Sequence, residues 1–167
     1  MTRGSAPVAR TADPARVRSA FRRHPEGVTI ITTLDEFGHQ WGMTATAVTA
    51  VSLEPPLLLV CVANRSGLTG PMTAGAGFVV HFLAGDQAEL ARRFATPLED
   101  KFAGTSYRFT PRGCPRLTGV AATLECVADT AHPAGDHTIV VGRILDVTLE
   151  EPAGDALVFF GGVVSTL

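Results

Sequence analysis

The sequence predicts a mainly β fold, an antiparallel barrel with a few peripheral helices. Several short segments alternate apolar and polar residues with the period of two that is typical of strands. These segments follow one another without the regular strand-helix alternation of a parallel doubly wound sheet. Hydrophobic residues make up 46% of the chain and charged residues 18%. Closing so apolar a sheet into a barrel removes the edge strands that it would otherwise expose.

The length of 167 residues favours one domain, because compact domains usually contain about one to two hundred residues. We expect residues 1–13 to form a flexible N-terminus and residues 14–167 to form the domain. The longest apolar run, Leu57–Ala63, is far shorter than the roughly 18 residues of a membrane span. Residues 1–13 contain no apolar core of a secretory signal, so a cytoplasmic protein is expected.

The first elements are a helix and a hairpin. Asp13-Pro14 combines a capping side chain with a proline at the first helical position, which predicts a helix start. Val17 and Phe21 fall on one face of this helix, so we expect it to dock by a narrow stripe. Val28–Leu34 alternates as a strand does, and Asp35–Gly38 predicts the turn of a hairpin.

The next segment predicts three stretches of strand. Trp41–Leu53 is rich in Thr, Ala and Val, which suits a strand followed by irregular backbone, and Glu54–Pro56 ends it. Leu57–Ala63 predicts a buried strand. A short helix is expected to begin at Gly70-Pro71, and Phe78–Leu83 predicts another strand.

The third helix is expected to begin at Asp86, because an acidic N-cap followed three residues later by Glu89 resembles a capping box. Its buried face contains Leu90, Ala91 and Phe94. The stretch from Pro97 to Pro115 contains Gly and aromatic residues without a period, so we expect a loop with one short strand.

The last third of the sequence predicts a hairpin and a final strand. Apolar residues alternate over residues 122–128 and again over residues 139–149, which predicts two strands. The residues between them, His132–His137, are expected to form a polar tip. Leu157–Phe160 predicts the final strand before Gly161-Gly162.

Charge and cysteine content exclude several classes of function. Lys plus Arg number 14 and Asp plus Glu 16, for a net charge of −2, which is the wrong balance for a nucleic-acid binder. The three cysteines, Cys61, Cys114 and Cys126, are too far apart for a CxxC pair and do not suggest a disulfide framework. All basic residues except Lys101 are arginine, which reflects either genome composition or forked recognition of an anion at one or two positions.

No common catalytic signature is present. The sequence contains no GxSxG, HExxH, GxGxxG or GxxxxGK[ST] motif, so it does not predict a familiar hydrolase, metalloprotease or nucleotide-binding loop. His132 and His137 are the only pair suggestive of a metal site, but their spacing on a turn is weak support. We therefore expect no metal.

Three segments together resemble a known family. Gly42–Pro56 is similar to the GMT-x5-SVSLxPP signature of the short-chain flavin reductases, and Leu90–Ala95 and Gly135–His137 are similar to its LAxxFA helix and GDH turn. The resemblance extends from about Phe21 to the C-terminus. It implies an FMN-binding split barrel that forms a homodimer, with flavin near the subunit interface. It also implies NAD(P)H-dependent reduction of FMN, or of FAD, for a flavin-dependent monooxygenase that receives the reduced flavin.

The resemblance also implies which residues bind the flavin. Small residues would line its ring and ribityl chain largely through their backbone: Gly42, Met43, Thr44, Thr46, Ala47, Val48 and Thr49. A strand end would border the ring at Cys61, Val62 and Ala63. A loop would reach the phosphate with Ser66, Gly67, Leu68 and Thr69, and the amides of the helix after it would point toward that anion.

Charged site residues follow from the same resemblance. Arg93 is favoured for the phosphate because it flanks the buried helix face, and Arg92 is the alternative. Asp136 and His137 lie in the GDH turn, where His137 would sit over the flavin at the nicotinamide site, unless it is only a solvated turn histidine. Phe82 and Phe160 are either neighbours of the ring or core residues.

One departure from the family pattern concerns the C-terminus. Family members commonly have a Tyr two residues after the glycine of the last strand, where this chain has Val164. Nicotinamide affinity and the choice between NADH and NADPH are therefore open. The alternative function is a split-barrel module that binds flavin for storage or sensing without NAD(P)H turnover. An oxidase of the pyridoxamine-phosphate type is disfavoured because it lacks the two motifs.

Overall fold

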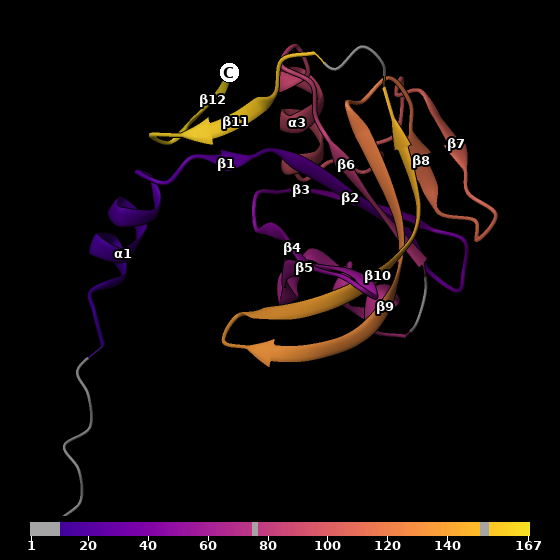
Figure 1. The fold of residues 1–167 in the computed structure, drawn as a ribbon, viewed down its shortest axis with the longest axis horizontal. Coiled ribbons are helices and arrows are strands. Elements are labelled where there is room, and N and C mark those ends of the chain that lie inside the picture. The colour runs from indigo at the N-terminus through magenta and orange to yellow at the C-terminus, as the bar shows by residue number, and fades with distance from the viewer. Residues whose placement is uncertain (1–10, 75–76, 151–153) are drawn as a thin grey trace, which may run out of the picture.

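A curled, seven-stranded antiparallel sheet dominates the computed structural model, which describes residues 11–74, 77–150 and 154–167 (Figure 1). Its strand order is β3-β2-β6-β9-β10-β5-β4. The strands are β2 (Thr29–Leu34), β3 (Gln40–Ala45), β4 (Val48–Leu53), β5 (Pro56–Ala63), β6 (Gly77–Phe82), β9 (Ala122–Ala134) and β10 (His137–Leu149). Only Thr46 and Ala47 separate β3 from β4, the two ends of the order, so the sheet curls into a barrel. The predicted mainly β split-barrel fold is confirmed.

In the part of the chain that the structure describes, two smaller sheets and three α-helices surround this barrel. The strands are β1 (Glu26–Gly27), β11 (Leu157–Phe160) and β12 (Val163–Thr166) in one sheet and β7 (Tyr107–Phe109) and β8 (Pro115–Leu117) in the other. The helices are α1 (Pro14–Phe21), α2 (Thr69–Thr73) and α3 (Ala88–Ala95), with a 3-10 turn η1 (Asn64–Ser66) before α2. In Figure 1, α1 and the β11–β12 hairpin project from one side of the barrel.

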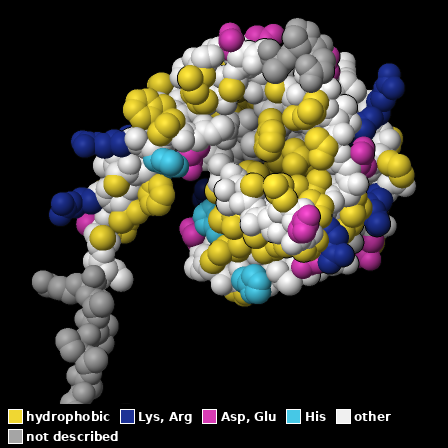
Figure 2. Space-filling view, in the orientation of Figure 1, with side chains coloured by type: hydrophobic (Ala, Val, Ile, Leu, Met, Phe, Trp, Pro, Cys, Tyr) yellow, Lys and Arg dark blue, Asp and Glu magenta, His cyan; other side chains and the backbone are white. Residues whose placement is uncertain are grey.

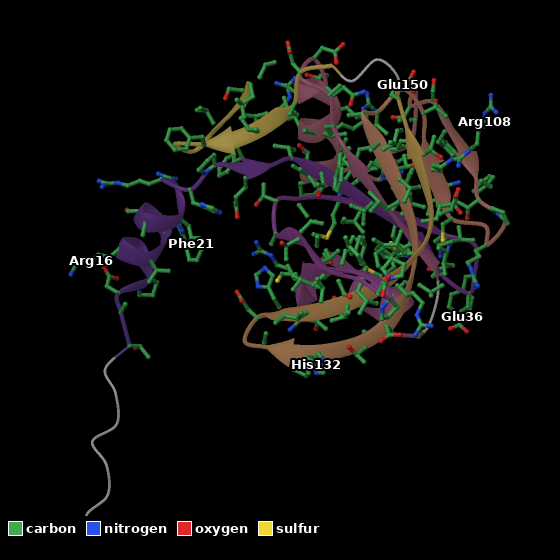
Figure 3. All side chains as sticks on the ribbon, in the orientation of Figure 1. Arg16, Phe21, Glu36, Arg108, His132 and Glu150 are labelled. Atoms are coloured by element: carbon green, nitrogen blue, oxygen red, sulfur yellow. The ribbon has the colours of Figure 1, made fainter. Side chains whose placement is uncertain are left out.

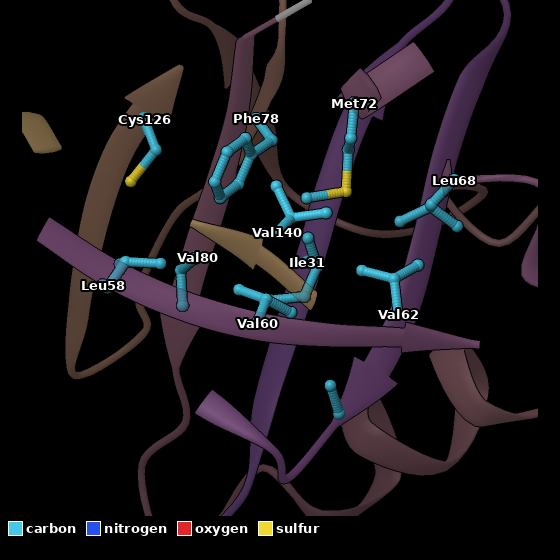
Figure 4. Close-up of a cluster of buried hydrophobic side chains, with 11 residues drawn as sticks. Ile31, Leu58, Val60, Val62, Leu68, Met72, Phe78, Val80, Cys126 and Val140 are labelled. Carbon is cyan, nitrogen blue, oxygen red and sulfur yellow. The ribbon is translucent and has the colours of Figure 1, made fainter. Parts of the chain in front are cut away.

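Two apolar clusters stabilise the fold. The first fills the barrel and contains Ile31, Val60, Val62, Leu68, Met72, Phe78, Val80 and Val140, among others (Figure 4). The second lies between α3 and the sheet and contains Ile30, Leu83, Ala91, Phe94, Phe102, Leu117 and Leu157, among others. The second cluster fixes α3 beside β3, where both elements line the cavities described below.

The strand β2 is more buried than its alternation predicts. Ile30, Ile31, Thr32 and Thr33, which alternate between the two faces of the strand, are all fully buried. The Thr33 hydroxyl donates to the Gly77 carbonyl at 2.8 Å, and the Thr32 hydroxyl donates to the Pro115 carbonyl. Buried hydroxyls are tolerated here because each has a backbone acceptor.

The first helix begins as predicted but does not dock as expected. The Asp13 carboxylate accepts from the Ala15 amide at 3.3 Å, with Pro14 in the first turn. No residue of α1 is buried, and Phe21 is 64% exposed. Figure 2 shows α1 standing away from the barrel, so the expected docking stripe is wrong for the single chain.

Three other details differ from expectation. Gln87, not Asp86, is the N-cap of α3, and no side chain caps the helix. The polar tip of the β9–β10 hairpin is only Gly135 and Asp136, because both strands continue to this two-residue turn, with Gly135 at a φ of +65°. The strand β12 was not predicted, although Gly161 and Gly162, both at positive φ, provide the tight turn that a hairpin requires.

Candidate functional site

A cavity of about 1210 Å³ runs along β3, the edge strand of the main sheet. Five of the residues expected to bind flavin line it: Gly42, Met43, Thr44, Ala63 and Ser66. The opposite wall comes from the end of α3 and the loop that follows it, residues 94–102. Among the described residues, no strand pairs with one edge of β3, so its backbone groups are available to this cavity.

Lys101 is a residue of this cavity that sequence reasoning missed. Its Nζ donates to the Gly42 carbonyl at 3.0 Å and to the Phe94 carbonyl at 2.9 Å, which ties β3 to the end of α3. Partial burial lowers the pKa of the Lys101 ammonium. It is the only lysine in the chain, and this departure from a chain otherwise rich in arginine was the available signal.

Gly42 is required by close packing against α3. A Cβ at this position would lie 2.5 Å from Cε1 of Phe94, a distance that side chains do not tolerate. Phe94 in turn packs edge-on against Phe102, with 5.2 Å between the ring centroids. The glycine of the GMT segment therefore allows α3 to approach β3.

Asp35, in the turn before β3, orients two aromatic side chains at one end of the cavity. Its Oδ2 accepts from the Trp41 indole at 3.0 Å and lies 3.2 Å from His39 Nδ1. Its Oδ1 accepts from the amides of Phe37 and His39. Burial alone would raise the pKa of Asp35, but these hydrogen bonds outweigh burial and lower it. Trp41 and His39 both line the cavity, and neither was in the expected site.

Trp41 also supports the loop that follows β5. Gly67 has a φ of +80°, and a Cβ there would lie 2.3 Å from Cζ3 of Trp41. The indole thus packs directly on the backbone of Gly67, next to Ser66 and Arg65 in the cavity wall. Ser66 and Gly67 were expected at the flavin phosphate. In the structure, Ser66 lines the larger cavity, and Gly67 packs against the Trp41 ring.

A second, smaller cavity of about 660 Å³ lies on the other side of Thr44. Its walls are mostly apolar and come from β3, α3, β11 and β12, including Ala45, Ala91, Phe159 and Val164. Thr44 and Ala95 line both cavities, so the two spaces meet beside the edge of β3. The Thr44 hydroxyl donates to the Ala91 carbonyl at 2.6 Å, which fixes α3 at this junction.

The two arginines of α3 occupy different places. Arg92 lines the smaller cavity and forms an ion pair with Glu89. Arg93 donates from Nη1 to the Ala103 carbonyl at 2.8 Å and lines neither of these cavities. The geometry therefore brings Arg92, rather than the favoured Arg93, to the candidate site. Thr46 also lines the smaller cavity, where its hydroxyl donates to Glu26 at 2.7 Å.

His137 lies at the start of β10, opposite Ala63 of the larger cavity. Its Nδ1 is 2.7 Å from Asp136 Oδ1, and this hydrogen bond from His137 lowers the pKa of the Asp136 carboxyl. The Asn64 amide donates to the Asp136 carbonyl at 3.1 Å, and the Thr138 hydroxyl donates to Asn64 Oδ1 at 2.8 Å. These bonds fix the GDH turn to the end of β5.

Other expected site residues lie elsewhere. Val62 and Leu68 are buried in the barrel core and line neither cavity. Ala47, Val48, Thr49 and Cys61 lie where β4 meets β5 and line neither cavity. Phe82 and Phe160 are 39% and 48% exposed, so neither belongs to the core.

Thr69 begins α2, one residue earlier than expected. Its Oγ1 is buried and has no hydrogen-bond partner among the described residues. A buried hydroxyl without a partner is unusual, and this one lies in the loop expected at the phosphate.

Two statements on metal ligands and membrane helices hold for residues 11–74, 77–150 and 154–167. Over these ranges, no group of three or more His, Cys, Asp or Glu side chains is arranged to hold a metal ion. In the same part of the chain, no helix has the length and apolar character needed to cross a membrane. His132 lies on the exposed outer side of the β9–β10 hairpin (Figure 3).

Comparison with known proteins connects this site to one family. The flavin reductase like domain model matches residues 21–167. The chain is 44% identical to the stachydrine N-demethylase reductase subunit Stc3 of Rhizobium meliloti, over 79% of this chain and 57% of the relative. It is 36% identical to a flavin reductase of Pseudomonas putida, over 97% of this chain and 96% of the relative.

A solved structure agrees with the sequence relatives. The NADH:FAD oxidoreductase SgcE6 of Streptomyces globisporus C-1027, in complex with NAD and FAD fragments, superposes with a TM-score of 0.86 at 34% identity. The match covers 95% of this chain and 97% of that one. The chain spans about half the length of the first curated relatives that it matches. The family model and these relatives together show that the chain belongs to the flavin reductase like domain family.

Proposed function

We propose that this chain is an NAD(P)H-dependent flavin reductase, which transfers hydride from reduced nicotinamide to FMN or FAD. The observation that carries the proposal is the pair of cavities that meet at Thr44, one apolar and one bordered by Lys101, Arg65 and Ser66. A flavin has the same division, because a planar apolar ring is joined through a ribityl chain to an anionic phosphate. The names of the Pseudomonas and Streptomyces relatives support this activity.

The residues present fit a flavin. The apolar walls of the smaller cavity would hold the ring, and the available backbone of β3 would hydrogen-bond its polar edge. Lys101 has no acidic hydrogen-bond partner among the described residues, so its charge is available to the phosphate. The Thr69 Oγ1 is buried without a partner among the described residues, which calls for an explanation. A phosphate bound at this loop would give that hydroxyl an acceptor.

The chemistry requires little from the side chains. When bound, the flavin supplies the hydride-accepting chemistry itself. The protein's residues bind and orient the two partners, and the α3 wall limits the access of water to them. Backbone amides of β3 that face the cavity would stabilise negative charge at the ring edge. This division of work explains why the sequence contains no catalytic nucleophile motif.

His137 and Asp136 are proposed to bind the nicotinamide. His137 is 43% exposed at its side chain and is oriented by Asp136, while Asn64 holds the turn beside Ala63 of the larger cavity. An oriented, accessible imidazole can donate to the carboxamide of a nicotinamide ring. The residues therefore support a binding role, in which His137 touches the cosubstrate.

Steady-state oxidation of NADH and of NADPH, each with FMN and with FAD, tests the proposal. The expected result is flavin-dependent oxidation of at least one nucleotide at a rate that saturates with flavin. Absence of oxidation in all four combinations, for a folded protein that still binds flavin, would support the alternative instead. That alternative is a flavin-binding module for storage or sensing, and it is favoured by Val164, which lines the smaller cavity where family members commonly have a Tyr.

We also propose two partners. A second copy of the chain would cover the apolar side chains that β4 and β10 expose, Val51, Leu53, Leu145, Val147 and Leu149, because surfaces of this kind usually mark interfaces. Sedimentation analysis tests the homodimer.

The reduced flavin would pass to a flavin-dependent monooxygenase, as the reductase subunit name of the Rhizobium relative suggests. A cytoplasmic location is consistent with three free cysteines, since reduced thiols persist there.

A further inference from the structure

The larger cavity continues beyond the residues that a flavin mononucleotide needs. Its polar lining includes Lys101, Arg65 and Ser66, and along β3 every residue from Gly38 to Thr44 lines it. Residues 38–44 would span about 20 Å at the usual rise of a strand. Its volume of about 1210 Å³ exceeds the range of about 300–1,000 Å³ found for drug-sized ligands.

The far end of the cavity is built from two aromatic rings. His39 and Trp41 both line it, and the Asp35 carboxylate bonds to both rings at 3.2 and 3.0 Å. The Trp41 indole is further held against Gly67. Rings that are fixed in this way lose little conformational entropy when a ligand stacks on them.

The charges along the cavity lie next to these rings. Arg65 and Ser66 precede Gly67, on which Trp41 packs, so the polar groups and the aromatic end are neighbours. Glu99 and Asp100 also line the cavity, but Asp100 Oδ1 accepts from the amides of Phe102 and Ala103. Along β3 the lining therefore runs from Thr44, which it shares with the apolar cavity, past Gly42, which Lys101 bonds, to Trp41 and His39.

We infer that the flavin this site prefers is the dinucleotide FAD, with its adenine stacked at the His39–Trp41 end of the larger cavity. The inference rests on the proposed function and names the form of flavin that it uses. The ring–phosphate–base order of FAD matches the order of the surfaces. FMN would fill the apolar cavity and the cationic junction and leave the aromatic end without a ligand.

Isothermal titration of the full chain with FAD, FMN and AMP tests this inference. FAD is expected to bind about 5- to 150-fold more tightly than FMN, the factor that about 1–3 kcal/mol of base–aromatic stacking provides. AMP is expected to compete with FAD and to leave FMN binding unchanged. Equal affinity for FAD and FMN would overturn the inference.

Variants locate the adenine. His39→Ala is expected to lower FAD affinity toward that for FMN, while FMN affinity stays within about twofold. Trp41→Leu also removes the ring that packs on Gly67, so it is expected to lower FAD affinity more than FMN affinity. Trp41→Phe should retain most of the preference because it keeps a stacking ring. The matched control is Phe21→Ala, which removes an exposed aromatic ring on α1, outside the residues that line the cavity. His39→Ala alters only an exposed side chain, so it remains informative if Trp41→Leu does not fold.

The outcomes separate this inference from the proposed function. Equal losses of FAD and FMN affinity in the variants would show that the rings only shape the phosphate loop, and would overturn the adenine site. A rise in the NADH KM with FMN as acceptor, with an unchanged FAD-to-FMN ratio, would assign the rings to the nicotinamide nucleotide and also overturn it. Failure of both flavins to bind would contradict the proposed function itself.

Discussion

The ammonium of Lys101 donates a hydrogen bond to the main-chain carbonyl of Gly42, with 3.0 Å between the two atoms. A second bond of 2.9 Å reaches the carbonyl of Phe94. One side chain therefore joins the open edge of β3 to the end of α3, at the wall of the larger cavity. Lys101 both shapes this wall and provides a positive charge where the proposed phosphate would bind.

Lys101→Met should lower both stability and flavin affinity. It removes two charge-assisted hydrogen bonds, so the free energy of unfolding should fall by about 1–3 kcal/mol, and the Kd for FMN should rise about tenfold or more. Urea unfolding and flavin titration measure the two effects. Lys101→Arg should recover part of the affinity, and Arg108→Ala, at an exposed cation (Figure 3), should change neither. Unchanged FMN affinity in Lys101→Met would limit Lys101 to a structural role.

His137→Ala should weaken the binding of the nicotinamide nucleotide. We expect the KM for NADH to rise about tenfold and the Kd for flavin to stay within twofold, because His137 is assigned to the cosubstrate. His132→Ala is a matched control, since His132 is an exposed histidine on the neighbouring strand. Steady-state kinetics measure the change. An unchanged NADH oxidation rate and KM in His137→Ala would remove the proposed role.

Gly42→Ala should destabilise the contact between β3 and α3. The added Cβ would lie 2.5 Å from the Phe94 ring, and overpacking of this kind costs about 1–3 kcal/mol. Thermal unfolding measures the loss. Gly70→Ala is the control, because nothing lies within 4 Å of a Cβ at that position. Equal melting temperatures for the two variants would show that Phe94 of α3 does not pack closely against Gly42.

The buried His81 should make the free energy of unfolding fall as the pH is lowered. It is fully buried, its Nδ1 donates to the Ile30 carbonyl at 2.9 Å, and its Nε2 accepts from the Leu117 amide at 3.0 Å. Burial lowers the pKa of His81 from 6.5 to about 4. Between these values the unfolded chain binds the proton and the folded chain does not. The free energy of unfolding should therefore fall by about 3 kcal/mol as pH drops from about 6.5 to about 4.

Urea unfolding across that pH range measures the contribution of His81. His81→Gln keeps a donor and an acceptor but does not titrate, so its stability should depend less steeply on pH than that of the unmodified chain. His132→Ala, at an exposed histidine, should leave the slope unchanged. The same slope in His81→Gln and the unmodified chain would assign the acid sensitivity to other groups.

Much of the fold could be predicted from local pattern. The strand periods, the Asp13-Pro14 helix start and the Asp35–Gly38 turn all depend on neighbouring residues, and the structure confirms them. The full burial of Thr32 could not be predicted, because its acceptor, the Pro115 carbonyl, is distant in sequence. The short tip of the β9–β10 hairpin was not predicted, because the residues from His132 to His137 are mostly polar or turn-forming and lack apolar alternation.

The candidate site was only partly predictable. The motif segments led to Gly42, Thr44 and Ser66, which do line the larger cavity. Trp41, His39 and Lys101 were missed, since their importance comes from contacts with Asp35, Gly67 and the β3 edge. The preference between Arg92 and Arg93 was set by a helical wheel, which does not include the carbonyl of Ala103 that holds Arg93.

The most direct test of the central claim is an anaerobic mixing experiment. The protein is loaded with FAD or FMN, NADH or NADPH is added without oxygen, and the visible absorbance of the flavin is followed. If the two joined cavities form one flavin site beside the nicotinamide site, the flavin absorbance should bleach within one turnover. At low nucleotide concentration, His137→Ala should slow this bleaching. A bound flavin that keeps its oxidised spectrum with both nucleotides would contradict the account.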